Sequence, residues 1–171
     1  MLVIASVFGE LAITSSTLPA SVPFDGHKRD TVSRVVHEVR DHSDITNWVI
    51  AGHSLGGALA ARIAHENPAL DARFVLIGTT HPKRDDLSQH TQPFTKILGT
   101  YDGVAPLDEA LSNRELLPSN TRWIKIDGGN HSQFGHYGTQ LLDNEPAISR
   151  ARQQQLTRQV LLETLGITPV D

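Results

Sequence analysis

The feature that most constrains the fold is a short apolar run that passes almost directly into a helical segment. Trp48–Ala51 is apolar and precedes Gly52-His53-Ser54. Leu55–Glu66 follows at once, is rich in alanine, and is ended by Asn67-Pro68. A buried strand joined to a helix by so short a turn is typical of parallel sheets, whose crossover connections are helices. We therefore expect the chain to fold around a parallel sheet.

The same alternation of short apolar runs and helical periods continues along the whole chain. It predicts an α/β fold with a mostly parallel sheet of about five strands and helices on both faces. We find no linker or repeat, so residues 1–171 are expected to form a single domain. The expected strands are Leu2–Val7, Trp48–Ala51, Phe74–Thr79, Lys96–Thr100 and Trp123–Ile126, and the expected helices are Asp30–Asp41, Leu55–Glu66, one opened by Pro106, and one from Ser149 to Leu165.

Composition excludes several classes of partner and cofactor. The net charge is −4 with no block of Lys or Arg, which argues against nucleic acid. The chain has no Cys, no H-E-x-x-H motif and no phosphate-binding glycine loop, so we expect neither a metal nor another cofactor. No stretch reaches the ~18 apolar residues of a membrane span. Residues 2–20 lack the basic start of a signal peptide, so we expect a cytoplasmic protein.

The turn between the strand and the helix has the pattern G-x-S-x-G, with Ser54 at its centre. In a nucleophile elbow, a sharp turn exposes the serine hydroxyl above the sheet. Gly52 and Gly56 leave room where a Cβ would crowd the backbone. The N-terminus of the following helix presents N–H groups to a developing oxyanion, and we expect the Leu55 N–H to be one donor. Ser54 is therefore a candidate nucleophile.

A serine nucleophile requires a base, which an acid orients, and in elbow-containing α/β folds the chain order is Ser, acid, His. Asp102 directly follows the expected strand Lys96–Thr100, and His131 follows Trp123–Ile126 through a glycine-rich turn. Both residues should lie at the carboxyl edge of the sheet, where Ser54 also emerges. We expect Asp102 as the acid and His131 as the base. Asp127 and His136 are the alternatives, and we rank both second.

Three segments carry a resemblance to a known family. GHSLGG at 52–57, GTYDGVAP at 99–106 and GGNHSQFG at 128–135 resemble the small α/β-hydrolases allied to dienelactone hydrolases and simple carboxylesterases. The resemblance covers most of the chain from Trp48 onward. It implies that Ser54, Asp102 and His131 are nucleophile, acid and base. Dienelactone hydrolase itself uses Cys as the nucleophile, so the serine departs from that branch.

The sequence before Trp48 departs from the pattern of this fold. The second oxyanion donor comes from a loop after an early strand, and residues 1–46 have room for only one βα unit. We expect either an N-terminally truncated hydrolase, our preferred interpretation, or a Phe8–Gly26 segment recruited to supply the missing donor. A truncated chain would expose a sheet edge, which favours association, so we include a homodimer among the expected partners.

The connection Thr80–Pro93 is too short for a lid domain, so we expect an open site without a cap. An open site suits the hydrolysis of small carboxylic esters through an acyl-enzyme. A thioesterase or acyltransferase would use the same triad, and a protein without a complete oxyanion hole would be a weak or silent binding protein. Residues expected to line the substrate site are Phe8, His53, Thr79, Thr80, His81 and the Ser132–Tyr137 loop, with His53 also interpreted as a packing residue.

Overall fold

The computed structural model describes the backbone of residues 2–8, 10–16 and 24–30, and the backbone and side chains of residues 31–42, 44–136, 138 and 140–167. The elements follow in the order β1 (Leu2–Phe8), β2 (Glu10–Ser16), α1 (Phe24–Asp41), β3 (Trp48–His53), α2 (Leu55–Glu66), β4 (Arg73–Ile77), β5 (Phe94–Gly99), α3 (Leu107–Ser112), η1 (Arg114–Leu116), β6 (Arg122–Ile126), η2 (Ser132–Phe134) and α4 (Arg150–Leu165).

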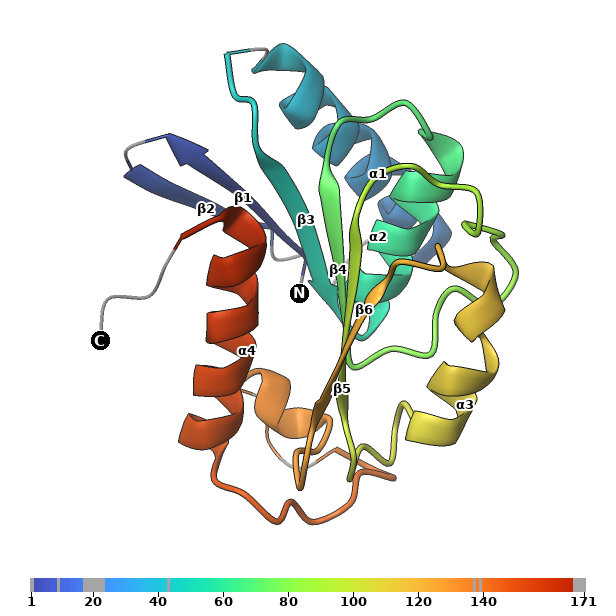
Figure 1. Cartoon of the computed structure of the whole chain (residues 1–171), viewed down its shortest axis with the longest axis vertical. Helices are drawn as coiled ribbons and strands as arrows, with labels where there is room; N and C mark the ends of the chain where they lie inside the picture. The colour runs from blue at the N-terminus through green and yellow to red at the C-terminus, as the bar shows by residue number, and fades with distance from the viewer. Residues whose placement is uncertain are drawn as a thin grey trace.

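One six-stranded sheet has the strand order β2-β1-β3-β4-β5-β6 (Figure 1). Strands β3 to β6 are parallel, and β1 pairs antiparallel with both β2 and β3. The parallel strands all run the same way, so the loops after β3, β5 and β6 meet at one edge of the sheet. That carboxyl edge carries Ser54, Asp102 and His131.

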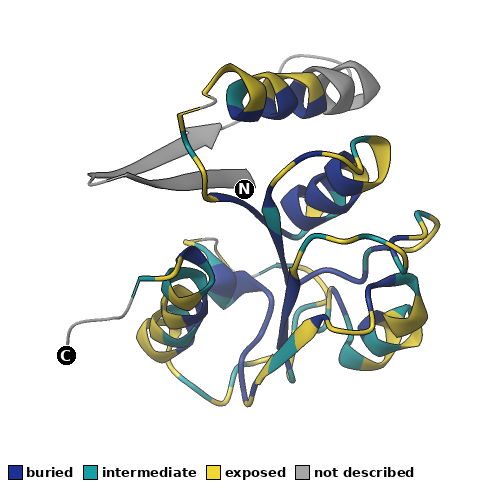
Figure 2. Cartoon of the chain, turned by 45° about the horizontal axis from the view of Figure 1, so that its top comes forward, coloured by how far each residue is buried: buried dark blue, intermediate teal, exposed yellow. Residues whose placement is uncertain are grey.

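Each central strand is buried on both faces because its side chains alternate between two apolar layers. Trp48 and Ile50 of β3 pack with α1 and α2 on one face, while Val49 and Ala51 pack with α4 on the other. Phe74–Ile77 of β4 alternates in the same way. Figure 2 shows the buried strands between helices whose outer faces are exposed. The predicted α/β class with helices on both faces is confirmed.

The strand count and the N-terminal prediction need correction. The parallel part of the sheet has four strands, fewer than the expected mostly parallel five, because Leu2–Phe8 runs antiparallel. Glu10–Ser16, expected as loop, is strand β2. Helix α1 begins at Phe24, so Asp30 lies inside it and does not cap it. Strands β1 and β2 form a hairpin, and β1 pairs with β3. This pairing occupies the side of β3 where a truncated chain was expected to expose a sheet edge.

A lysine is buried within the parallel sheet. Lys96 lies on β5, opposite Leu76 of β4 and Trp123 of β6, and only 1% of its surface is exposed. Its ammonium donates a hydrogen bond to the carbonyl of His81. Burial lowers the pKa of Lys96 from 10.5 to about 7, because the apolar surroundings penalise the charged form.

Candidate active site

Ser54 lies in a strained turn between β3 and α2. Its φ and ψ are 56° and −118°, a conformation that non-glycine residues rarely adopt. The turn is held in place because the Ser54 N–H donates to the Ile77 carbonyl of β4 at 2.9 Å. A Cβ on Gly52 would meet the carbonyl of Gly56 at 2.1 Å, so only glycine fits there. This geometry is that of the expected nucleophile elbow.

His131 and Asp102 form a buried pair at the carboxyl edge. The Nδ1–H of His131 donates to the Asp102 carboxylate, at 2.9 Å to Oδ2 and 3.1 Å to Oδ1. The exposed fraction is 1% for His131 and 4% for Asp102. A carboxylate that accepts from Nδ1 leaves Nε2 as the acceptor and stabilises the imidazolium that forms when it takes a proton.

The Asp102 carboxylate has further partners within its own loop. The backbone N–H groups of Val104 and Ala105 donate to its Oδ1 at 3.0 and 2.6 Å. These hydrogen bonds fix the orientation of the carboxylate. Asp102 is therefore pre-organised to hold the His131 ring.

His53, the residue before Ser54, contacts His131 at the carboxyl edge. The rings of His53 and His131 lie 4.5 Å apart between centroids, tilted by 45°. Within the described residues, no hydrogen bond joins the Ser54 hydroxyl to His131. Catalytic hydrogen bonds are often long before substrate binds and tighten when it does.

His53 stays neutral in this position. Burial, followed by repulsion from His131, lowers its pKa from 6.5 to about 3. Its ring also packs against Phe134 of η2, with centroids 5.5 Å apart. Only 5% of His53 is exposed, so it acts here as a packing residue behind His131.

The alternative acid and base do not join this arrangement. Asp127 and His136 are both exposed, and neither contacts Asp102 or His131 in the described part of the chain. Of the candidates weighed from the sequence, the structure brings Asp102 and His131 together.

Thr79 and Thr80, two of the residues expected to line the substrate site, are both buried. Thr79 is buried against α2, where its methyl would lie 2.7 Å from a Cβ on Gly57, and its hydroxyl contacts His81. Thr80 is also buried, and its carbonyl accepts from Asn113. Both threonines are therefore largely covered by neighbouring residues of the protein.

The expectation for Phe8 is wrong in its position along the sheet. Leu2 pairs with Gly52 beside the elbow, and Ser6 pairs with Trp48 at the start of β3. Phe8 comes two residues after Ser6, so it lies beyond Trp48, at the end of β3 away from Ser54. A strand rises ~3.3 Å per residue, which separates the two ends of β3. The side chain of Phe8 lies outside the described residues. Strand β2 ends at Ser16, which pairs with Leu2. Residues 17–23, which belong to the Phe8–Gly26 segment considered as the source of the second oxyanion donor, also lie outside the described residues.

Sequence reasoning missed the residues that hold the histidine loop, which we define as residues 127–135 after β6. Gln153 of α4 is fully buried, accepts from Asn130 N–H at 3.0 Å and donates to the Asn130 carbonyl at 2.7 Å. Asp143 accepts hydrogen bonds from both His131 and Ser132. No local motif marks either residue, because their partners are distant in the sequence.

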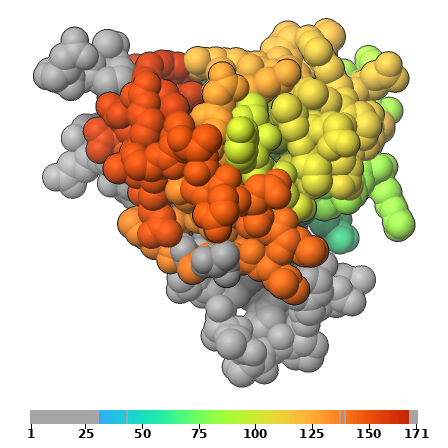
Figure 3. Space-filling model, turned by 90° about the horizontal axis from the view of Figure 1, so that it is seen from below, coloured from blue at the N-terminus to red at the C-terminus, as the bar shows by residue number. Residues whose placement is uncertain are grey.

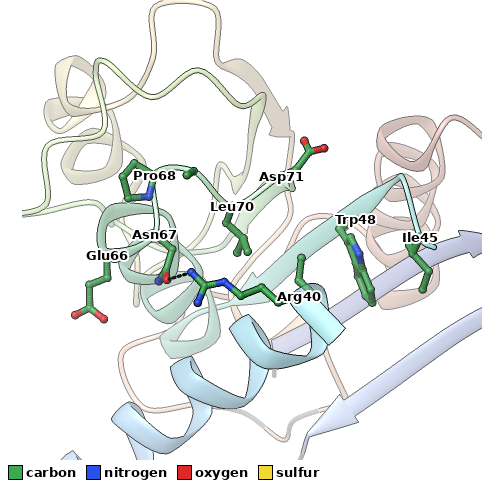
Figure 4. A pocket seen from close by; sticks show the side chains of 10 residues that line it. Arg40, Ile45, Trp48, Glu66, Asn67, Pro68, Leu70 and Asp71 are labelled. Carbon is green, nitrogen blue, oxygen red and sulfur yellow. Dashed lines mark hydrogen bonds between the residues drawn. The ribbon is translucent and has the colours of Figure 1, made fainter. Parts of the chain in front are cut away.

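Figure 3 looks directly onto the carboxyl edge. The yellow-green surface near residue 100 is enclosed by the yellow segment after it and by the orange segments around residues 130–150. A separate cavity of about 560 Å³ lies at the opposite edge, between the ends of α1 and α2 (Figure 4). Trp48, Leu70 and Arg40 line it, and Arg40 donates to Asn67 at 3.4 Å. That cavity is far from Ser54, since Trp48 begins β3 and Ser54 follows its other end.

The described residues contain no group of three or more His, Cys, Asp or Glu side chains arranged to hold a metal ion. Nor does any helix among them have the length and apolarity to cross a membrane.

The sequence matches the model of the alpha/beta hydrolase family over residues 28–155. None of the curated proteins matches it. Similar solved structures include a predicted CIB-like hydrolase from Thermoplasma acidophilum, with 14% identity and a TM-score of 0.58 over 82% of this chain and 62% of that one. An alpha-beta serine hydrolase homologue from Coxiella burnetii has 19% identity and a TM-score of 0.52, over 69% and 55%.

A third similar structure is MGS-MChE2, an alpha/beta hydrolase enzyme from the metagenome of lagoon sediments in Morocco. Its identity is 20% and its TM-score 0.53, over 78% of this chain and 69% of that one. The chain thus spans 62% and 55% of the lengths of the first two structures. At these identities the likeness concerns the fold.

Proposed function

Because the chain belongs to the alpha/beta hydrolase family, we propose that it is a serine hydrolase that cleaves small carboxylic esters through an acyl-enzyme. The observation that carries the proposal is the buried His131–Asp102 pair, bonded at 2.9 Å, at the sheet edge where the strained Ser54 turn emerges. A packed core has no need of an ionisable pair at this place, whereas a serine nucleophile requires one.

The proposed mechanism uses Ser54 as nucleophile, His131 as base and Asp102 as acid. Ser54 Oγ attacks the ester carbonyl while His131 Nε2 takes its proton, and Asp102 stabilises the imidazolium. The tetrahedral intermediate collapses, His131 returns the proton to the departing alcohol, and an ester of Ser54 remains. Water then attacks this acyl-enzyme with His131 as base, which releases the carboxylic acid and restores the Ser54 hydroxyl.

The Leu55 N–H is the first oxyanion donor in this proposal. Leu55 begins α2, and the first N–H groups of a helix have no acceptor within the helix. A single donor would leave the oxyanion short of roughly 2.7–4 kcal/mol of stabilisation. The alternative expected from the sequence, a donor from the Phe8–Gly26 segment, is compatible with the register of β2, whose last residue Ser16 pairs with Leu2 beside Gly52.

The substrate class is inferred from the walls around Ser54. The connection between β4 and β5, residues 78–93, contains no helix or strand that could cover the site. Leu55, Tyr101 and Val104, which neighbour the candidate catalytic residues, are 39%, 47% and 39% exposed. An open site beside exposed apolar side chains suits esters with a short apolar acyl group.

Covalent labelling tests the proposal directly. A fluorophosphonate probe should modify wild-type protein at Ser54, identified by peptide mass spectrometry, and should fail with Ser54→Ala. The exposed Ser119 provides a matched control, because Ser119→Ala should label like the wild type. The Ser54→Ala variant should also lose on the order of 10⁴–10⁶ in the rate of p-nitrophenyl acetate hydrolysis without loss of thermal stability.

The outcomes separate the alternatives. Labelling together with faster turnover of a matched thioester, or transfer to an added alcohol, would assign a thioesterase or acyltransferase with the same triad. If the probe does not label Ser54 of the wild-type protein, the chain is a binding protein with an incomplete site, and the proposal is wrong.

A further inference from the structure

Asp143 joins the two loops that carry the acid and the base. It lies in the segment between η2 and α4. Its Oδ1 accepts from the N–H groups of Gly103 and His131, at 3.3 and 3.1 Å. Its Oδ2 accepts from the N–H and the hydroxyl of Ser132, at 2.8 and 2.6 Å. We call Asp143 with Gly103, His131 and Ser132 the Asp143 clamp.

The clamp connects residues that belong to separate parts of the chain. Gly103 follows Asp102 in the loop after β5, and His131 and Ser132 lie in the histidine loop after β6. A side chain that bonds the backbone on both sides fixes the distance between the two loops. The Asp102–His131 hydrogen bond spans the same gap, so its length depends on that distance.

The backbone around Asp143 is built for this close approach. A Cβ on Gly103 would meet the carbonyl of Leu142 at 2.2 Å and the side chain of Asn144 at 3.0 Å. Leu142 itself has a φ of 73° although it is not a glycine and is 79% exposed. Within the described residues, the non-glycine positions with positive φ are Ser54 and Leu142. Such strain persists only where surrounding contacts enforce it, and it concentrates at functional sites.

The charge of Asp143 suits its contacts. Partial burial raises its pKa, but hydrogen bonds from the Ser132 side chain and from the Ser132, His131 and Gly103 backbone outweigh that effect and leave the pKa below its usual value. Asp143 is therefore ionised at neutral pH, when its carboxylate accepts from every donor of the clamp.

We propose that Asp143 is a positioning residue that sets the geometry of the Asp102–His131 pair, an inference that rests on the proposed function. Asp143 bonds the backbone of His131, whereas Asp102 bonds its ring, so the two acids have separate tasks. The contribution of Asp143 to the reaction is the placement of the base over Ser54, and a misplacement of ~1 Å can cost about a hundredfold in rate.

The test compares Asp143→Ala and Asp143→Asn with Glu145→Gln, an exposed acid in the same segment. Three quantities are measured: kcat and KM for p-nitrophenyl acetate, the rate of fluorophosphonate labelling at Ser54, and the downfield proton resonance of the His131 Nδ1–H. Asn keeps the size and one acceptor oxygen, so the second variant remains informative if Asp143→Ala does not fold.

We expect kcat and the labelling rate to fall about 10- to 100-fold in Asp143→Ala, and less in Asp143→Asn, with KM within about twofold of the wild type. The downfield resonance should be lost or broadened in a protein that still unfolds cooperatively, and Glu145→Gln should match the wild type. Wild-type labelling with an unchanged resonance in both Asp143 variants would overturn the inference. If the wild type is not labelled but the resonance changes, the proposed function fails while the clamp stands.

Discussion

Replacing Lys96 by methionine should stabilise the protein at and below neutral pH and remove a rise in stability that the wild type shows in alkaline solution. Lys96 is 1% exposed on β5, and its ammonium donates a hydrogen bond to the His81 carbonyl. Burial lowers its pKa from 10.5 to about 7. Folding therefore requires either a charge in an apolar layer or the loss of a proton.

The sign follows from the two pKa values. Between pH 7 and 10.5 the unfolded chain holds a proton at Lys96 that the folded chain has released, so stability increases with pH across this window. The slope approaches ~1.36 kcal/mol per pH unit, and the full difference between 10.5 and about 7 corresponds to about 5 kcal/mol. Below pH 7 the whole cost is present. Methionine has no proton to release, although it leaves the His81 carbonyl without its donor, at ~1–3 kcal/mol.

The assay is urea unfolding followed by circular dichroism at several values between about pH 6 and about pH 10. Subtracting the free energy of unfolding of the wild type from that of Lys96→Met cancels the titration of all other groups. The difference should be largest near pH 6 and fall by several kcal/mol toward pH 10. Lys125→Met, an exposed lysine on the neighbouring β6, should give a difference that does not change with pH. A flat difference for Lys96→Met would refute the argument.

Three further predictions concern the candidate site. Asp102→Asn should lower kcat of ester hydrolysis by about 10⁴-fold, because the amide no longer holds the His131 tautomer; wild-type turnover in that variant would exclude Asp102 as the acid. Burial and then repulsion from His131 lower the pKa of His53 to about 3. His53→Gln should therefore leave the shape of the pH–rate profile unchanged between about pH 5 and about pH 9. A shifted acid limb in that variant would show that His53 titrates in this range. Gly52→Ala should destabilise the fold by several kcal/mol in thermal unfolding, since the new Cβ would lie 2.1 Å from the Gly56 carbonyl, whereas Gly138→Ala, with open space around it, should be neutral.

The parts of the fold that could be predicted from the sequence are those with strong local patterns. Helix α2 runs from Leu55 to Glu66 as predicted, because the elbow starts it and Asn67-Pro68 ends it. Ser149 caps α4 and Gly166, with φ 77°, ends it. The strand β2 was missed because its apolar run, Leu11–Ile13, is short and is flanked by Glu10 and by polar residues 14–16. Its pairing with β1 is also a property of the hairpin that the local pattern does not show.

The candidate site shows the same division. The relation of Asp102 to His131 could be predicted, since both residues follow strands of one parallel sheet and therefore meet at one edge. Asp143 and Gln153 could not, because the partners in these hydrogen bonds lie 11 to 40 residues away in the chain and neither residue sits in a recognisable motif. The error over Phe8 arose because β1 was expected to run parallel to β3, and the antiparallel register reverses which end lies near Ser54.

The position of Ser54, held apart from the loop that follows β4, has a consequence for how the proposed site can change its specificity. Ser54 is fixed by β3, α2 and the Ile77 carbonyl, while the connection 78–93 passes beside it without regular structure. Lys83 and Arg84 are exposed on that connection, and exposed loop tips accept inserted sequence. A segment grafted between them could form a cap with new walls for the acyl group while the reacting atoms keep their places. Selection for a different substrate therefore has a route through this loop that does not alter Ser54, Asp102 or His131.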